Sequence, residues 1–145
     1  MTSSIPFGTD GWRARIGRDL TFDSTARVID AIASWSSSPA NGDPGDGDTL
    51  PIVHDTRFLS RELAAESAAR LATKGFRILL SDRAVPTPCA SWHVKERGLR
   101  GGIAITASHN PPEYNGMKIG VGKTTLYGEA IQEILRLVLK GEFAS

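Results

Sequence analysis

The stretch Gly-Gly-Ile-Ala-Ile-Thr-Ala-Ser-His-Asn-Pro-Pro occupies residues 101–112 and places a serine directly after a short apolar run. An apolar run bounded by glycines predicts a buried strand over residues 101–105. Pro111 and Pro112 end extended pairing, because proline has no ladder N–H and biases its predecessor away from helix. The stretch therefore predicts a constrained loop that presents Ser108 at the end of a strand, where open α/β sheets usually place their sites.

The chemistry of Ser108 depends on its neighbours. A hydroxyl nucleophile needs an adjacent base or a positive field, and both His109 and Lys118 are candidates for these roles. The alternative is a polar turn whose hydroxyls only cap local backbone groups. Adjacency in sequence does not ensure contact in space, so the residues alone leave both interpretations open.

Upstream, residues 11–15 predict a first strand with one buried face, because Trp12 and Ala14 alternate with Arg13 and Arg15. Taken alone, Arg13 fits a solvated charge on an edge strand. It also fits a phosphate ligand, since a guanidinium matches the paired oxygens of a phosphate.

The rest of the chain alternates helical and strand patterns. Apolar spacing predicts a helix from about 21 to 35, with Phe22 in its packing stripe. Ser60 and Thr87 are predicted to cap two further helices, which end at Lys74-Gly75 and near residue 95. Further strands are predicted at 50–55, 76–81 and 116–120, and a last amphipathic stripe comprises Tyr127, Ile131, Ile134 and Val138.

This order predicts an α/β three-layer sandwich, with a mixed, mostly parallel sheet and helices on both faces. Residues 36–49 are rich in serine, glycine, proline and aspartate, and predict a flexible loop. Three aspartates in this loop suggest a metal loop, but the closing glutamate of an EF-hand is missing.

Composition narrows the class of protein. The 145 residues fit one domain, and 40% hydrophobic with 23% charged residues is ordinary for a globular protein. A formal net charge of +1 favours neither a nucleic-acid nor a membrane partner. The single cysteine, Cys89, fits a reducing compartment, and no signal peptide or membrane-spanning run is visible. We therefore expect a cytoplasmic location.

Residues 106–111, Thr-Ala-Ser-His-Asn-Pro, resemble the phosphoserine loop of the α-D-phosphohexomutases, the phosphoglucomutase/phosphomannomutase superfamily. Three further stretches agree in order and spacing: Phe-Gly-Thr-Asp-Gly-Trp-Arg at 7–13, Asp-Thr-Arg-Phe-Leu-Ser at 55–60, and Asn-Gly-Met-Lys-Ile at 115–119. The resemblance covers the first of the family's four domains, so we expect residues 1–145 to form that domain. The tail at 121–145 departs from the family's usual sequence.

The resemblance implies a phosphoryl transfer between the 1- and 6-positions of a hexose phosphate. Ser108 would carry the phosphate, with His109 as a positioning donor and Lys118 as a proton shuttle or charge stabiliser. Arg13, Thr9 and Asn110 would bind phosphate or substrate, and Asn110 would also orient the loop. Mg²⁺ would be held through the phosphate on Ser108 and by a second domain that this stretch of sequence does not contain.

The same resemblance implies hexose 1,6-bisphosphate as an activator, a hexose phosphate as substrate, and the remaining mutase domains as partners. Without them we expect this chain to lack turnover. A non-enzymatic phosphosugar-binding or regulatory module is the alternative. Trp12 favours the glucose- and mannose-phosphate mutases over the phosphoglucosamine branch, which stays open as an alternative.

Overall fold

The computed structural model describes residues 11–37, 49–121 and 129–141. In chain order the elements are β1 (Gly11–Arg15), α1 (Phe22–Ser36), β2 (Thr49–His54), α2 (Ser60–Thr73), β3 (Arg77–Leu80), α3 (Pro88–Glu96), β4 (Gly102–Ile105), β5 (Tyr114–Val121) and α4 (Glu129–Lys140). Every predicted strand and helix is present. The ends of the predicted 36–49 loop belong to α1 and β2, and its centre, 38–48, lies outside the described residues.

The five strands form one sheet in the order β1-β5-β4-β2-β3. β2 pairs in parallel with both β3 and β4, whereas β5 is antiparallel to its neighbours β4 and β1. Four strands therefore point the same way and β5 alone runs opposite, which confirms a mixed, mostly parallel sheet. Gly11 and Gly116 allow β1 and β5 to pair, because a Cβ at either position would collide with the opposite backbone.

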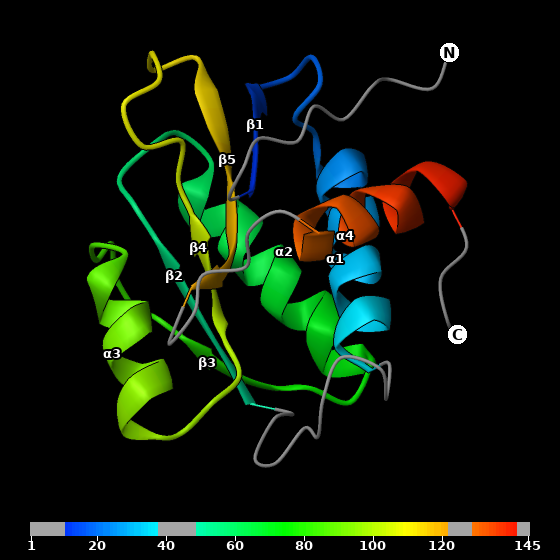
Figure 1. The fold of residues 1–145 in the computed structure, drawn as a ribbon. Coiled ribbons are helices and arrows are strands. Elements are labelled where there is room, and N and C mark those ends of the chain that lie inside the picture. Colours follow the sequence, from blue (N-terminus) through cyan, green and yellow to red (C-terminus); the bar gives the residue numbers. More distant parts are fainter. Residues whose placement is uncertain (1–10, 38–48, 122–128, 142–145) are drawn as a thin grey trace.

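Helices cover both faces of the sheet (Figure 1). α2 packs on β2, β3 and β4 and also contacts α1, which in turn contacts α4. α3 packs on β2, β4 and β5 and lies on the other side of the sheet. The three-layer α/β sandwich predicted from the sequence is confirmed.

Strand alternation divides the core into two unequal parts. Ile52 and Ile103 point into the larger cluster beneath α1, α2 and α4, whereas Val53 and Ala104 point into a small cluster with Ala90 of α3. Trp12, only 1% exposed, belongs to the larger cluster. The side covered by α3 is therefore the thinly packed side of the sheet.

Two details of the helix predictions are wrong, and a third is confirmed only in its position. Phe22 is 45% exposed, because it is the first residue of α1 and lies beyond the turn that packs on the core. Ser60 does not cap α2: the N-cap is Leu59 in a left-handed conformation, and the Ser60 hydroxyl donates to Asp55 instead. Thr87 precedes Pro88 as predicted but makes no side-chain capping bond. Thr21, by contrast, forms a complete capping box with Ser24.

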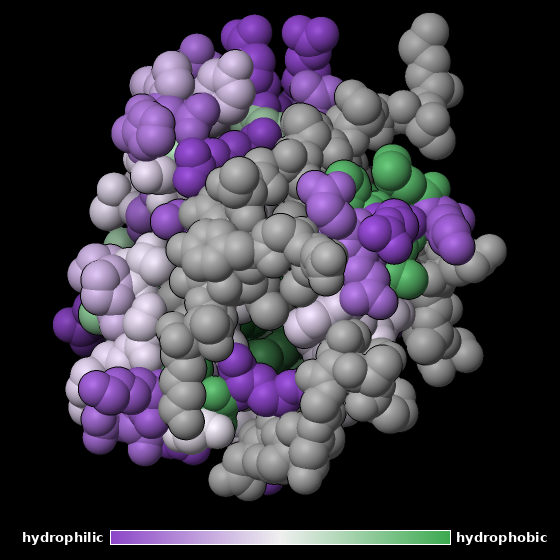
Figure 2. Space-filling model, viewed as in Figure 1, coloured by the Kyte–Doolittle hydropathy of each residue, from purple (hydrophilic) through white to green (hydrophobic). Residues whose placement is uncertain are grey.

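α4 belongs to the fold, because Ile134 and Val138 are fully buried in the larger cluster. Arg27 of α1 donates to the Val138 carbonyl oxygen at 3.1 Å. Tyr127 and the side chain of Ile131 lie outside the described residues. Figure 2 shows apolar side chains gathered over α4, where Leu139 is 63% exposed. Among the described helices, none has the length and apolar character needed to cross a bilayer.

Candidate active site

The serine loop, residues 106–113, connects the neighbouring strands β4 and β5. Its ends are joined where the Thr106 N–H donates to the Gly116 carbonyl at 3.0 Å, and the Tyr114 N–H donates to the Pro111 carbonyl at 3.0 Å. The Asn110 N–H donates to the Ala107 carbonyl at 3.0 Å and forms an inner turn. The loop therefore leaves the carboxyl end of β4 and returns directly to β5.

Ser108 is exposed and stands in the left-handed region at φ 55°. Such a conformation is uncommon for a residue other than glycine, and costs about 1 kcal/mol or more unless the surroundings enforce it. The Ser108 N–H donates to the Thr106 hydroxyl at 3.1 Å. Its Oγ lies 3.4 Å from Nδ1 of His109, which is long for a hydrogen bond but close enough for a short movement to form one.

Lys118 and Arg13 share one face of the sheet near this loop. Lys118 of β5 pairs with Ala104 of β4, and cross-strand partners point to the same face, so Lys118 lies on the thinly packed side. Arg13 alternates with buried Trp12 and therefore points to that same side. Its register partner is Gly116, the residue that bonds Thr106 at the start of the serine loop. The sheet thus brings both cations to the level where the loop begins.

Arg57 crosses from the loop after β2 to the serine loop. Its Nη1 donates to the carbonyl oxygens of Pro111 at 2.9 Å and Tyr114 at 3.0 Å. Its Nη2 donates to the carbonyls of Ser108 at 2.9 Å and Asn110 at 2.6 Å. Nε lies 3.4 Å from Oδ2 of Asp55. Each of the two amino nitrogens of the guanidinium therefore binds two carbonyls, and Nε forms an ion pair with Asp55.

A buried polar network also connects the loop after β2 to the start of β5, directly after the serine loop. Asp55 Oδ1 accepts from the Arg57 N–H at 2.9 Å and from the Ser60 hydroxyl at 2.6 Å. Asn115, fully buried, donates from Nδ2 to Ser60 Oγ at 2.8 Å and to the Phe58 carbonyl at 3.1 Å. Each buried polar group that these bonds satisfy would otherwise lose its solvation without compensation. The two loops thus form one hydrogen-bonded unit.

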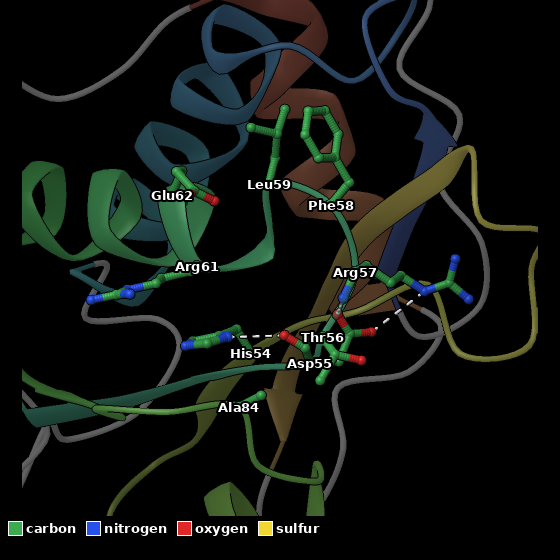
Figure 3. Close-up of a pocket in the computed structure, with 9 residues that line it drawn as sticks. All are labelled: His54, Asp55, Thr56, Arg57, Phe58, Leu59, Arg61, Glu62 and Ala84. Atoms are coloured by element: carbon green, nitrogen blue, oxygen red, sulfur yellow. Dashed lines mark hydrogen bonds and ion pairs between the residues drawn. The ribbon is translucent and has the colours of Figure 1, made fainter.

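A pocket of about 420 Å³ lies beside this unit, at the carboxyl end of β2 (Figure 3). It is lined by His54, Asp55, Thr56, Arg57, Phe58, Leu59, Arg61, Glu62 and Ala84. The Arg57 side chain extends away from His54 and Arg61, as expected from its bonds to the serine loop. Ser108, His109 and Lys118 are not among the lining residues, so the pocket adjoins the serine loop without containing it.

The structure brings only some of the predicted site residues together. Ser108 and His109 are in near contact, and Arg13 and Lys118 share a face, whereas Thr9 lies outside the described residues. The backbone of Asn110, rather than its amide, makes the bonds that shape the loop. Among the described residues, no group of three or more His, Cys, Asp or Glu side chains could hold a metal ion.

No role was predicted from the residues alone for Arg57, Asp55 or Asn115, and Ser60 was predicted only as a helix cap. One signal was available, because Asp55-Thr56-Arg57 follows a strand and therefore had to lie at the same sheet edge as the loop after β4. The contacts that Arg57 makes with the serine loop and that Asn115 makes with Ser60 join residues more than fifty positions apart, which no local pattern reveals.

These features define a class: an α/β/α domain that presents an exposed, conformationally restrained serine next to a histidine, with Arg13 and Lys118 on one face of the adjoining sheet. The family model described as "Phosphoglucomutase/phosphomannomutase, alpha/beta/alpha domain I" matches residues 4–145, and its match includes residues 121–145. The chain belongs to this family.

Curated relatives span several sugar phosphates. The "Probable phosphoribomutase" of Schizosaccharomyces pombe is 36% identical over 120 residues, covering 82% of this chain and 20% of the relative. The phosphoglucosamine mutase of Synechococcus sp. (strain WH7803) is 33% identical over 140 residues, covering 97% of this chain and 28% of the relative. This chain thus spans less than a third of the length of these relatives.

Solved structures agree with the fold. A protein of Thermus thermophilus, assigned as a phosphomannomutase, superimposes with a TM-score of 0.84 at 34% identity, covering 95% of this chain and 30% of that one. A phosphoglucomutase/phosphomannomutase family protein of Burkholderia thailandensis gives a TM-score of 0.78 at 27% identity, covering 94% of this chain and 30% of that one.

Proposed function

We propose that this chain is the phosphoserine domain of a phosphohexomutase, in which Ser108 carries the phosphoryl group exchanged between the 1- and 6-positions of a hexose phosphate. The observation that carries the proposal is the exposed Ser108, held at φ 55° with its hydroxyl 3.4 Å from His109. Family membership supports the same reaction class. A cytoplasmic location is part of the proposal.

In the proposed transfer, Ser108 Oγ forms a bond to phosphorus as the bond between phosphorus and the sugar oxygen breaks. Lys118 takes the serine proton and returns a proton to the sugar oxygen, while His109 holds the hydroxyl in line. Arg13, on the same face as Lys118, would neutralise phosphate oxygens, together with Thr9 and Asn110. Phosphoryl transfer depends mainly on such positioning and on charge stabilisation.

A phosphate on Ser108 would offer Mg²⁺ the hard oxygen ligand that this ion prefers. Because the described residues contain no cluster of metal-ligating side chains, we propose that the other ligands come from a further domain. Bound there, the ion would neutralise charge on the transferring group. The sugar site would lie in further domains too, so we expect this chain alone to accept phosphate without isomerising the sugar.

The resemblance favours glucose or mannose phosphate only through the residue type at position 12. That residue, Trp12, is 1% exposed inside the larger core, so it can mark a family branch without contacting the sugar. Relatives that carry the names phosphoglucomutase and phosphoglucosamine mutase are 35% and 33% identical to this chain. We therefore leave the hexose open.

The test is to incubate the chain with hexose 1,6-bisphosphate and Mg²⁺ and to locate phosphate by mass spectrometry. We expect a single phosphoserine at position 108, no labelling in Ser108→Ala, and no useful isomerisation. Labelling elsewhere, or unchanged labelling in Ser108→Ala, would remove Ser108 from this role. Binding of the bisphosphate without any labelling would favour the non-enzymatic module.

A further inference from the structure

Arg57 joins the loop after β2 to the serine loop through its whole guanidinium. Four of its N–H donors bind four carbonyl oxygens between Ser108 and Tyr114, and the fifth faces Asp55. The side chain is 15% exposed; its bonds to Tyr114 and Asn110 are partly buried, and those to Pro111 and Ser108 lie at the surface.

The serine loop has an unusual need for such a donor. Pro111 and Pro112 have no N–H, so the peptide groups that precede them can accept hydrogen bonds but cannot donate them. Two carbonyls of this acceptor-rich turn, those of Asn110 and Pro111, point to Arg57. A guanidinium is a planar fork whose two amino nitrogens can reach four carbonyls at once, whereas an ammonium has three donors on a single nitrogen.

Backbone strain falls in the two loops that Arg57 joins. Within the described residues, only Ser108 and Leu59 are non-glycine residues with positive φ, at 55° and 65°. Such conformations persist where surrounding contacts over-determine them. The Ser108 carbonyl is itself an Arg57 acceptor, and in a planar trans peptide the N–H of His109 then points away from Arg57.

We propose that Arg57 is the positioning residue of the serine loop: by binding the carbonyls of Ser108, Asn110, Pro111 and Tyr114, it holds Ser108 in the left-handed conformation that presents its hydroxyl. The role in phosphoryl transfer rests on the proposed function, whereas the hold on the loop does not. Arg57 acts through the loop backbone and touches no reacting atom.

The experiment compares Arg57→Lys with Arg83→Lys. Arg83 is a matched control, since it also pairs with a nearby aspartate, Asp82, yet both of its side-chain bonds go to that exposed carboxylate. Hydrogen exchange of amides in residues 106–114 is measured beside that of β2, and phosphoserine formation is followed with hexose 1,6-bisphosphate and Mg²⁺.

In Arg57→Lys we expect loop exchange to speed up by about tenfold or more, with β2 exchange unchanged, because bonds from a charged donor are among the stronger ones. Ser108 labelling should slow by about the same factor, and Arg83→Lys should match the wild type in both measurements. Full retention of loop protection in Arg57→Lys would overturn the proposal, since charge alone would then suffice.

Two outcomes separate this proposal from the proposed function. If the wild type is never labelled but loop exchange still rises in Arg57→Lys, phosphoryl transfer fails and the hold on the loop stands. If Arg57→Lys unfolds, Asp55→Asn keeps the guanidinium and replaces its carboxylate partner by a neutral amide. In that variant, loop exchange that stays at the wild-type rate supports direct holding by the guanidinium, and loop exchange as fast as that of an unstructured peptide contradicts it.

Discussion

Two arginines organise this domain in different ways. Arg57 binds backbone carbonyls and joins two irregular loops, whereas Arg70 of α2 binds a carboxylate and joins two regular helices. Arg70 donates from Nε and Nη2 to the two oxygens of Asp30 on α1, both at 2.6 Å, and Lys74 lies 3.4 Å from the same carboxylate. Arg57 therefore acts on the backbone of a loop, whereas Arg70 links the side chains of two helices.

This difference predicts which property of the domain changes when each arginine is replaced. A helix retains its shape through its own hydrogen bonds, so losing Arg70 should weaken packing without altering local backbone. A loop without regular bonds takes its shape from outside contacts, so losing the Arg57 network should change local order first. Variants of the two networks should therefore separate global stability from loop order.

The largest effect is expected for Asn115→Ala, which removes the buried amide beneath the Arg57 network. The Phe58 carbonyl and the Ser60 hydroxyl would lose a donor, and the Gly116 N–H would lose its acceptor. We expect the free energy of unfolding to fall by about 3 kcal/mol, with faster exchange in the serine loop than in α1. Urea denaturation with hydrogen exchange measures both, and a loss shared equally by loop and helix would contradict the comparison.

Arg70→Ala should cost less and act globally. It leaves the buried Asp30 with Lys74 alone, and we expect about 2 kcal/mol of lost stability, since the 39% exposed Arg70 side chain is partly screened by solvent. Chemical denaturation gives the value. The ratio of serine-loop exchange to β2 exchange should equal that of the wild type. Faster exchange in the loop alone would show that the Arg70 and Arg57 networks are coupled, and would contradict the comparison.

Asp30→Asn tests the Arg70 ion pair through the pH dependence of the free energy of unfolding. Burial of Asp30 opposes its charged form, but the hydrogen bond and charge of Arg70, aided by Lys74, outweigh this and hold its pKa below the ordinary value. A lowered pKa contributes stability above the unfolded-state pKa of about 4, and that stability is lost as pH falls through the folded pKa. We therefore expect the stability gap between Asp30→Asn and wild type to be full at pH 7 and to shrink below about pH 4. Urea titrations across this range would show a constant gap if the ion pair were unimportant.

Asp82→Asn should have the smallest effect. The hydrogen bond and charge of Arg83 also lower the pKa of Asp82, but both side chains are more than three-quarters exposed, so water screens the pair. We expect thermal melts of this variant and of the wild type to coincide at every pH. A shift comparable to that of Asp30→Asn would show that burial does not set the strength of these pairs.

Local sequence predicted the elements well, because strand alternation at Trp12 and Ala14 and helical spacing through Ile29 and Val28 depend on near neighbours. Capping was harder to predict. Ser60 has the composition of an N-cap, but Asp55 five residues earlier competes for its hydroxyl. That competition follows from the tertiary position of two loops, which capping statistics do not include.

The position of the serine at the end of a strand was predictable, and the contacts that hold its loop were not. The strand-end serine and its neighbour His109 could be predicted from twelve consecutive residues. The hold on their loop depends on Arg57, and the face of Arg13 depends on which strand lies beside β1. Both are set by long-range pairing, which one sequence without structure does not specify.

The position of β1 has a consequence for how the site assembles. β1 is an edge strand whose neighbour, β5, lies about a hundred residues later in the chain, whereas β2, α2 and β3 are consecutive. Closing so long a loop costs more chain entropy than closing short ones, so contacts of high sequence separation tend to form late. We expect the serine loop to be ordered before Arg13 reaches it, so that the cationic face of the site is completed in the last step of folding.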